Sequence, residues 1–333
     1  MKKNIYSLTI NFLTILVVFM GQSCRKDKLP TISTSSITNT TPTNADCGGT
    51  ISSDGGAAII ERGVCWSTNQ NPTIADNKTL DGAGSGNYTS YLTGLTKNKT
   101  YYVRAYATNK VGTNYGNQVS FIADFPNCGT ITDIDGNVYH SVTIGAQCWM
   151  KENLKVKHFR NGDLINTTND ALNISSEVAP TYQFAYGGDE NNVSIYGRLY
   201  TWYTITDSRN VCPIGWHIPT EAEWDILIAS TGGRQYAANY LKEEGSIHWT
   251  TTLNISGTDS YGFCALPGGY HGVNENVFLS EYLGTAGYWW TSTEDSSNNN
   301  DEVRYKSIFD ASSQVFGNSA PKFDSYSVRC IKD

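Results

Sequence analysis

Short alternating runs of apolar and polar residues dominate the chain from about residue 31 to residue 123. Gly, Asn and Asp separate these runs, a pattern that predicts a small antiparallel sandwich. The clearest strand is predicted over residues 100–108. Because successive side chains of a strand point to opposite faces, Tyr101 and every second residue up to Ala107 are expected in the core, and Tyr106 outside.

From residue 127 the pattern changes to dispersed Trp and Tyr between Gly-rich loops. The stretch 129–147 predicts a hairpin, two alternating strands around the turn Asp135-Gly136-Asn137. Further on, Thr220 and Glu223 form a capping box that predicts the start of a helix. The apolar stripe of this helix is predicted to be Trp224, Leu227 and Ile228.

The first 23 residues read as an export signal. Lys2 and Lys3 precede an apolar run over 10–20 that is too short to span a membrane, and Gly21 to Ser23 lie directly before Cys24. This segment resembles a bacterial lipoprotein signal, although Gly21 stands where a Leu is usual. The resemblance implies that Cys24 becomes the first mature residue and carries acyl chains. Arg25, in place of the retention Asp of enterobacteria, favours the outer membrane; ordinary secretory cleavage or an uncleaved anchor are the alternatives.

The charge of the chain limits the kinds of partner that it can bind. The chain has 333 residues and a formal net charge of -7, which argues against nucleic acid, since such binding needs a basic patch. Length and the change of pattern near residue 124 predict two domains, over 31–123 and over 125–333, which follow the signal over 1–23 and a tether over 24–30.

Seven of the eight cysteines lie beyond Cys24, and in an oxidising compartment most should be paired. Cys128 and Cys148 flank the predicted hairpin at its open end, where a disulfide is geometrically feasible. Cys47 and Cys65 are expected on neighbouring core strands, either paired or as buried small hydrophobes. The spacing of Cys and His predicts no zinc site.

The first domain resembles a fibronectin type III domain. The segments "LTGLTKNKTYYVRAYATN" and "NYGNQVSF" are similar to its last strands, and "CGGTISSDGGAAIIERGVCWSTNQNPT" looks like a variant common in surface proteins of the Bacteroidetes. Tyr101 falls where that family places its tyrosine corner. The resemblance implies a spacer.

The second domain resembles the Fibrobacter succinogenes major paralogous domain. The matching stretches run in order: "DIDGNVYHSVTIGAQCWMKENL", "YGRLYTWYTI", "VCPIGWHIPTEAEWDIL", "YGFCALPGGYHG", "GYWWTSTE" and "SYSVRCIKD". Cys264 departs from the family, which usually has Ser there, and it is expected to be an unpaired, buried thiol.

The stretch "HIPTEAEWDIL" also looks like a signature of formylglycine-generating enzymes, which share a C-type-lectin-like fold. That resemblance implies a disulfide between Cys212 and Cys330. The predicted fold class is therefore an all-β Ig/fibronectin III-like sandwich followed by an α+β C-type-lectin-like domain.

Catalysis is not expected. Formylglycine-generating enzymes hold copper with two nearby cysteines, but residues 301–329 contain none, so an oxidase lacks its soft ligands. The five histidines are scattered outside any recognisable nucleophile motif. His217 is expected to be structural and His271 exposed. The carboxylates Glu221 and Glu223 lie in the first turn of the predicted helix, where negative charge is already favourable.

Binding has candidates in the region 270–301. Aromatic faces can stack on sugar rings, and clustered carboxylates can hold calcium. The candidate ligand-binding residues are Tyr270, His271, Trp289, Glu294, Asp295 and Asp301. Calcium stays open as a cofactor, and Asp133, Asp135 and Asn137 are better explained by a turn.

The sequence thus predicts a non-catalytic outer-membrane lipoprotein, held by its lipid anchor, that presents the second domain to a polysaccharide or a surface protein. A structural surface component is the alternative. An exposed aromatic cleft over 270–301 would favour the binding module, and buried rings would favour the structural component.

Overall fold

The computed structural model describes residues 26–168, 174, 177–250, 256–274, 277–295 and 302–333. The chain divides into two compact units near residue 122. The predicted lipidation site, Cys24, and the signal segment lie outside the described residues. Within the part that is described, no helix has the length and apolarity that crossing a bilayer requires.

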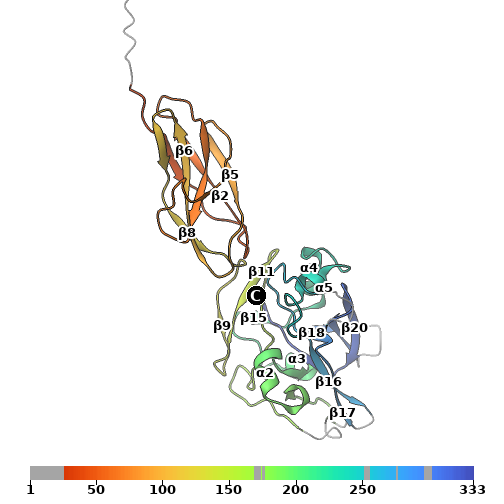
Figure 1. Cartoon of the computed structure of the whole chain (residues 1–333). Coiled ribbons are helices and arrows are strands. Elements are labelled where there is room, and N and C mark those ends of the chain that lie inside the picture. The colour runs from red at the N-terminus through yellow and green to blue at the C-terminus, as the bar shows by residue number, and fades with distance from the viewer. Residues whose placement is uncertain (1–25, 169–173, 175–176, 251–255, 275–276, 296–301) are drawn as a thin grey trace, which may run out of the picture. The chain divides into compact units, whose positions relative to one another are not determined.

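The first domain is a sandwich of two antiparallel sheets (Figure 1). One sheet contains three strands among the described residues, in the order β1 (Thr31–Thr34), β2 (Ala45–Ser53) and β5 (Gly86–Leu92). The other contains five, namely β3 (Glu61–Ser67), β4 (Asn77–Lys78), β6 (Thr100–Asn109), β7 (Gly112–Tyr115) and β8 (Val119–Ile122). The clearest predicted strand, over 100–108, is β6, and its residues Val103 and Ala105 are fully buried between the sheets.

Two features of β6 test the predicted pattern. The hydroxyl of Tyr101 accepts a hydrogen bond from the backbone N–H of Thr96 at 3.1 Å, as a tyrosine corner requires. Tyr106, however, was expected outside and is fully buried. Its hydroxyl donates to the carbonyl of Thr79 at 2.7 Å, because the chain following β4 covers this face of the sheet.

Cys47 and Cys65 are both buried and both free. Cys47 lies on β2 and Cys65 on β3, so they belong to different sheets and not to neighbouring strands. Burial raises the pKa of each thiol to about 11. The two cysteines are therefore buried small hydrophobic residues and do not form a disulfide.

The second domain is rich in β-structure with short helices (Figure 1). Its largest sheet has eight described strands, in the order β13 (Gln183–Phe184), β14 (Leu199–Thr201), β21 (Ser325–Ser327), β16 (Gly268–Asn274), β18 (Ala286–Glu294), β19 (Glu302–Phe309) and β20 (Val315–Pro321), with β17 (Val277–Leu283) beside β16. The predicted likeness to the C-type-lectin-like fold stays a prediction.

Smaller sheets and helices surround this sheet. The smaller sheets contain β9 (Ile131–Thr132) with β10 (Val138–Tyr139), and β11 (Ser141–Ile144), β12 (Gln147–Met150), β22 (Ile331–Lys332) and β15 (Trp216–His217). The helices are η1 (Tyr186–Gly188), α2 (Asn191–Tyr196), α3 (Trp202–Thr206), α4 (Glu221–Ser230) and α5 (Ala237–Leu241). The predicted turn at 135–137 joins β9 and β10, whereas β11 pairs with β12.

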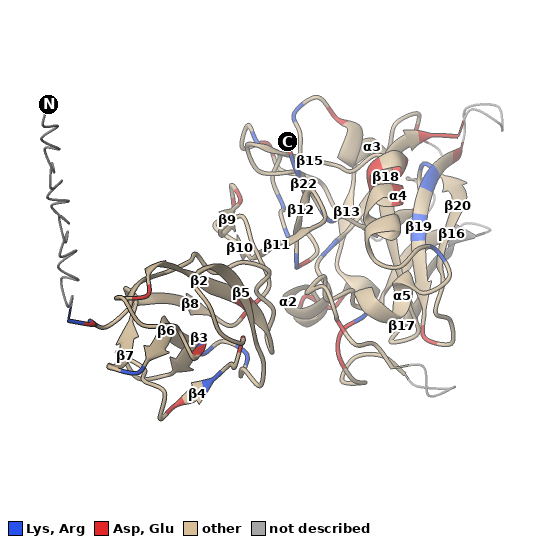
Figure 2. Ribbon diagram, turned by 90° about the horizontal axis from the view of Figure 1, so that it is seen from above, with Lys and Arg blue, Asp and Glu red and all other residues tan. Residues whose placement is uncertain are grey.

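Helix α4 confirms the prediction made from its capping box. The hydroxyl of Thr220 accepts a hydrogen bond from the N–H of Glu223 at 3.2 Å, and the Glu223 carboxylate accepts one from the N–H of Thr220 at 2.8 Å. Trp224, Leu227 and Ile228 are buried, as the apolar stripe predicts. On the same helix Glu221 and Asp225 pair with Lys306 of β19, which places red and blue ribbon side by side in Figure 2.

Strand β18 divides the core into two aromatic clusters. Its consecutive residues Trp289 and Trp290 are both fully buried and point to opposite faces of the sheet. Trp289 packs against Trp224, with ring centroids 6.0 Å apart. Trp290 stacks on Tyr326 at 4.2 Å. One strand therefore contributes to both halves of the core.

A buried polar node lies beside Trp289. The Oδ1 atom of Asn153 accepts hydrogen bonds from the Trp289 indole at 2.9 Å and from two nitrogens of Arg329 at 3.0 and 3.2 Å. Its amide donates to the carbonyl of Tyr196 at 2.8 Å and to the hydroxyl of Ser327 at 3.3 Å. Arg329 is fully buried, and burial lowers its pKa to about 10, so it stays charged at neutral pH.

Two disulfides join distant parts of the second domain. Cys128 pairs with Cys148, and Cys212 pairs with Cys330, which confirms both predicted pairings. Cys264 is free, as predicted, but only partly buried. The Cys212–Cys330 bond joins the loop between α3 and β15 to the residue that precedes β22.

Loss of the Cys212–Cys330 bond should cost more stability than loss of the other bridge. The bridges close loops of 118 and 20 residues, for which loop-closure entropy gives about 5 and about 3 kcal/mol. Guanidinium unfolding of Cys212→Ala/Cys330→Ala and Cys128→Ala/Cys148→Ala can be followed by tryptophan fluorescence. Only Trp66 of the eight tryptophans lies in the first domain, so the signal reports mainly on the second. Equal losses would contradict this ranking.

Asn153→Ala should lower the free energy of unfolding of the second domain by about 3 kcal/mol or more. It removes the acceptor shared by the Arg329 guanidinium and the Trp289 indole, and leaves a buried charge with fewer partners. Asn166→Ala is the matched control at an exposed position of the same domain, with an expected change within about 0.5 kcal/mol. Similar midpoints for the two variants in the same fluorescence assay would refute a stabilising role for the node.

Candidate functional site

The structure separates the predicted ligand-binding residues. Tyr270 and His271 lie on β16, Trp289 lies in the middle of β18, and Glu294 ends that strand. Asp295 follows directly, and Asp301 lies outside the described residues.

Trp289 cannot stack on a ligand, and its prediction as a binding residue was wrong. Its ring is fully buried among Trp224 and the Arg329 guanidinium, whose carbon lies 6.0 Å from the ring centroid. The reason is the position of β18, a central strand that is covered on both faces. Sequence alternation alone does not distinguish such a strand from one with a solvated face.

His271 was expected to be exposed but is buried, with an exposed fraction of 8%. Its Nδ1 lies 2.9 Å from the Ser280 hydroxyl, and its ring stacks on Phe184 at 4.5 Å. Burial lowers its pKa to about 4, so the ring is neutral at pH 7. A neutral, packed imidazole is part of the core beneath β16.

The two described carboxylates of the predicted cluster are engaged in other interactions. Glu294 pairs with Lys322 at 3.0 Å. Asp295 is buried, lies 3.3 Å from the guanidinium of Arg304 and accepts a hydrogen bond from the hydroxyl of Ser319. These pairs neutralise both charges, so the described residues do not assemble a calcium site here.

A group of tyrosines lies where the sheet face becomes accessible. We call Tyr270, Tyr282, Tyr288 and Tyr305 the tyrosine platform. Tyr282 of β17 is 47% exposed and stacks on Tyr270, with centroids 6.0 Å apart and planes 21° apart. Tyr270 and Tyr305 are partly exposed, while Tyr288 is buried beneath them at 5.4 and 5.9 Å.

Tyr282 is held in an unusual backbone conformation. Its φ is 66°, in the left-handed region that bulky residues rarely adopt. The carbonyl of Tyr282 accepts a hydrogen bond from the N–H of Thr285 at 3.0 Å, which closes the turn into β18. Such strain clusters at functional sites more often than elsewhere, and here it places an exposed ring against Tyr270.

Hydrogen-bonding groups surround the platform. The hydroxyl of Tyr270 donates to the Glu281 carboxylate at 3.3 Å. Burial and the charge of Glu281 raise the pKa of Tyr270 to about 12, so this hydroxyl keeps its proton at neutral pH. The platform therefore combines apolar faces with a donor and an acceptor. Sequence analysis included Tyr270 but missed Tyr282, because only the turn geometry brings the two together.

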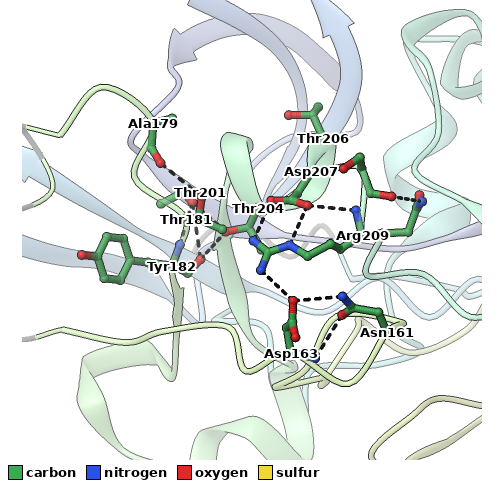
Figure 3. A network of polar contacts seen from close by, with 12 residues as sticks. Asn161, Asp163, Ala179, Thr181, Tyr182, Thr201, Thr204, Thr206, Asp207 and Arg209 are labelled. Atoms are coloured by element: carbon green, nitrogen blue, oxygen red, sulfur yellow. Dashed lines mark hydrogen bonds and ion pairs between the residues drawn. The ribbon is translucent and has the colours of Figure 1, made fainter.

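Two further polar clusters in this domain are held by internal hydrogen bonds and ion pairs. Figure 3 shows the guanidinium of Arg209 between two carboxylates, 2.8 Å from Asp207 and 3.2 Å from Asp163. The same guanidinium lies 3.9 Å from the ring centroid of Phe159. In Figure 3 the hydroxyls of Thr201 and Thr204 also bond to each other, at 2.9 Å. The Arg209 contacts join two loops, and the threonine hydroxyls bond to each other across the junction of β14 and α3.

The turn at 133–137 is likewise satisfied internally. The carboxylate of Asp133 accepts hydrogen bonds from the N–H groups of Asp135 and Asn137 at 3.0 and 2.9 Å, and from the hydroxyl of Tyr139 at 2.6 Å. Asp135 pairs with His158. These contacts agree with the expectation that a turn, and not a calcium loop, explains these residues.

The remaining histidines also have carboxylate partners. His140 lies 2.8 Å from Glu152, and His248 lies 2.8 Å from Glu243. His217 lies 2.7 Å from Asp333 and 2.9 Å from Glu223, the carboxylate of the capping box. Among the described residues, no group of three or more His, Cys, Asp or Glu is placed to hold a metal ion.

Fold and site together define a two-domain, β-rich protein with an aromatic platform on the sheet of its second domain. The chain belongs to the family of the Fibrobacter succinogenes major domain, whose model matches residues 142–332. This match confirms the family predicted from the sequence motifs. Among curated proteins, none matches the chain.

Solved structures similar to part of the chain include fibronectin type III domains. The sixth such domain of human fibronectin type III domain containing protein 3 is 19% identical, covers 32% of this chain and 96% of its own, and has a TM-score of 0.24. A structure titled as a myokine is 12% identical over 30% of this chain and 99% of its own, with a TM-score of 0.23. The sensor domain of the anti-sigma factor RsgI4 of Pseudobacteroides cellulosolvens is 15% identical over 29% and 76%, with a TM-score of 0.22.

The His217 ion pairs should make stability depend on pH. Burial lowers the pKa of His217, but the hydrogen bonds to Asp333 and Glu223 outweigh burial and raise it above the ordinary value. The contribution is therefore complete below the unfolded pKa of about 6.5 and is lost as pH rises through the higher folded pKa. His217 is partly exposed, so the contribution should stay below about 1 kcal/mol.

Guanidinium unfolding of the wild type and of His217→Gln, at about pH 5.5 and about pH 8.5, checks this assignment. The wild type should be the more stable protein at the lower pH, and the difference should shrink at the higher pH. A difference that is the same at both values, or that grows with pH, would contradict it.

Proposed function

We propose that this protein is a non-catalytic surface lipoprotein whose second domain binds a polysaccharide through the tyrosine platform. The observation that carries the proposal is the exposed ring of Tyr282, stacked on Tyr270 and held there by a strained backbone. Sugar rings have apolar faces of C–H groups and a rim of hydroxyls. The C–H faces can stack on the tyrosine rings, and the sugar hydroxyls can form hydrogen bonds with the Glu281 carboxylate and the Tyr270 hydroxyl.

The rest of the proposal follows from sequence and family. Membership of the Fibrobacter succinogenes major domain family supports a surface-associated protein. Acylation of Cys24 would hold the chain at the outer membrane, with the first domain as a spacer. A net charge of -7 favours a neutral ligand at the platform over a polyanion such as nucleic acid. The internal pairing of the described histidines supports a role without turnover.

A structural surface component is the second candidate. The burial of Trp289 and Trp290 favours it, since these rings form core and not a cleft. The platform favours the binding module, because packing does not require the exposed part of Tyr282. Ligand binding separates the two.

Tyr282→Gly should abolish binding on a glycan array, or weaken it by about tenfold or more, without loss of stability. Glycine accepts the left-handed backbone, so this variant removes the ring while relieving strain. The full-length protein is applied with and without calcium, and unfolding is measured in parallel. Tyr91→Ala removes a tyrosine of the first domain that is somewhat more exposed, and it should leave binding unchanged.

Two results would refute the platform as the binding surface. One is a glycan signal that survives in Tyr282→Gly. The other is the absence of any glycan signal from the wild type, which would favour the structural component. A glycan signal that requires calcium would contradict binding by the tyrosine rings and the Glu281 carboxylate alone.

A further inference from the structure

A cavity of the second domain lies beside α2, and its lining differs from the residues of the tyrosine platform. It has a volume of about 510 Å³, within the range of small-ligand sites. Three cationic side chains line it, namely Lys155, Lys157 and Arg198. On a chain with a net charge of -7, this concentration of positive charge indicates a place for an anion.

Arg198 is fixed in place before any ligand arrives. Its side chain is only 2% exposed. Its Nε donates to the carbonyl of Lys155 at 3.2 Å, and its Nη1 donates to the side-chain oxygen of Gln183 at 2.8 Å. The remaining face of the guanidinium is directed toward a carboxylate. A fork held in this way matches two oxygens at once.

The carboxylate in that position belongs to the protein itself. Glu190 accepts hydrogen bonds from Nη1 of Arg198 at 3.0 Å and from Nη2 through its second oxygen, and that oxygen lies 3.4 Å from the Lys157 ammonium. Glu190 is 62% exposed, in contrast to the buried guanidinium. The cationic side of the pair is therefore anchored, whereas the anionic side reaches in from solvent and can be exchanged.

The other carboxylate of the cavity does not cancel the lysines. Asp135 accepts hydrogen bonds from the backbone N–H of Lys157 and from the ring of His158. The ammonium of Lys155 donates to a backbone carbonyl, that of Ser194, at 3.1 Å. With Glu190 displaced, the cavity would hold two lysines and an arginine around one carboxylate that already has partners.

We propose that this cavity binds the carboxylate of a uronic acid, and that Glu190 occupies the same position when no ligand is present. The ligand carboxylate would take the two Arg198 hydrogen bonds, with Lys157 beside it. Asn137 and Ser194 also line the cavity, where they can contact sugar hydroxyls. All lining residues except Val193 are polar or charged, which favours a sugar over an apolar acid, since each buried hydroxyl needs a partner.

Titration calorimetry of the full-length protein with sodium glucuronate tests this proposal, with glucose and inorganic phosphate as comparison ligands. Glu190→Gln removes the competing charge and should bind glucuronate about tenfold more tightly than the wild type, whereas glucose should bind to neither. Lys157→Gln in the Glu190→Gln background should reverse most of that gain. Glu61→Gln, which removes the carboxylate of an ion pair in the first domain, is the matched control and should behave as the wild type.

Three outcomes would overturn the proposal. Glucuronate that binds neither the wild type nor Glu190→Gln would show that the Arg198–Glu190 pair is only structural. Equal binding of glucose would show that the carboxylate is not recognised. Binding of phosphate without binding of glucuronate would assign the cavity to another anion. None of these results depends on the tyrosine platform, whose ligand is tested by Tyr282→Gly.

Discussion

The hydrogen bonds between Asn153 and Arg329 are the constraint on which the second domain depends. A guanidinium that is fully buried must have partners, because an unpaired charge in the interior costs several kcal/mol. The hydrogen bonds described for Arg329 go to neutral oxygens, namely those of Asn153, Phe263 and Cys264, and its carbon lies 4.3 Å from the centroid of the Phe263 ring. The chain must bring all of these groups together at once, so the node specifies one arrangement of the surrounding strands.

The short strands around Arg329 pair weakly, so they need further contacts to hold them in place. Strands β15 and β22 have two residues each, too few for a ladder that would hold by itself. Arg329 and the disulfide-bonded Cys330 directly precede β22, so one short segment is held by a buried charge and by a covalent bond. Trp289, which donates to Asn153, also belongs to the strand that contributes to both core clusters. The fold is thus specified by a few long-range contacts around β18 and β22.

Features that depend on local spacing or on family motifs could be predicted from the sequence, whereas features that depend on tertiary contacts could not. The capping box of α4, the tyrosine corner of Tyr101 and the two disulfides depend on local spacing or on family motifs, and all four were predicted. The exposure of Tyr106, His271 and Trp289 depends on which segment covers a strand, and all three were misjudged. Alternation identifies the two faces of a strand but not whether both are buried. Tyr282 was missed because its contact with Tyr270 depends on the tertiary fold and exists only once the turn after β17 is formed.

The two candidate sites differ in the way they are prepared for a ligand. At the platform, the backbone of Tyr282 stores strain of the order of 1 kcal/mol to hold an exposed ring in one position, so little freedom is left for a ligand to remove. At the cavity beside α2, preparation is electrostatic, because Glu190 keeps the buried guanidinium paired until another carboxylate replaces it. An internal carboxylate lowers apparent affinity but keeps the empty site stable. A polysaccharide that contains both neutral and uronic sugars would engage both kinds of surface, one through ring faces and the other through charge.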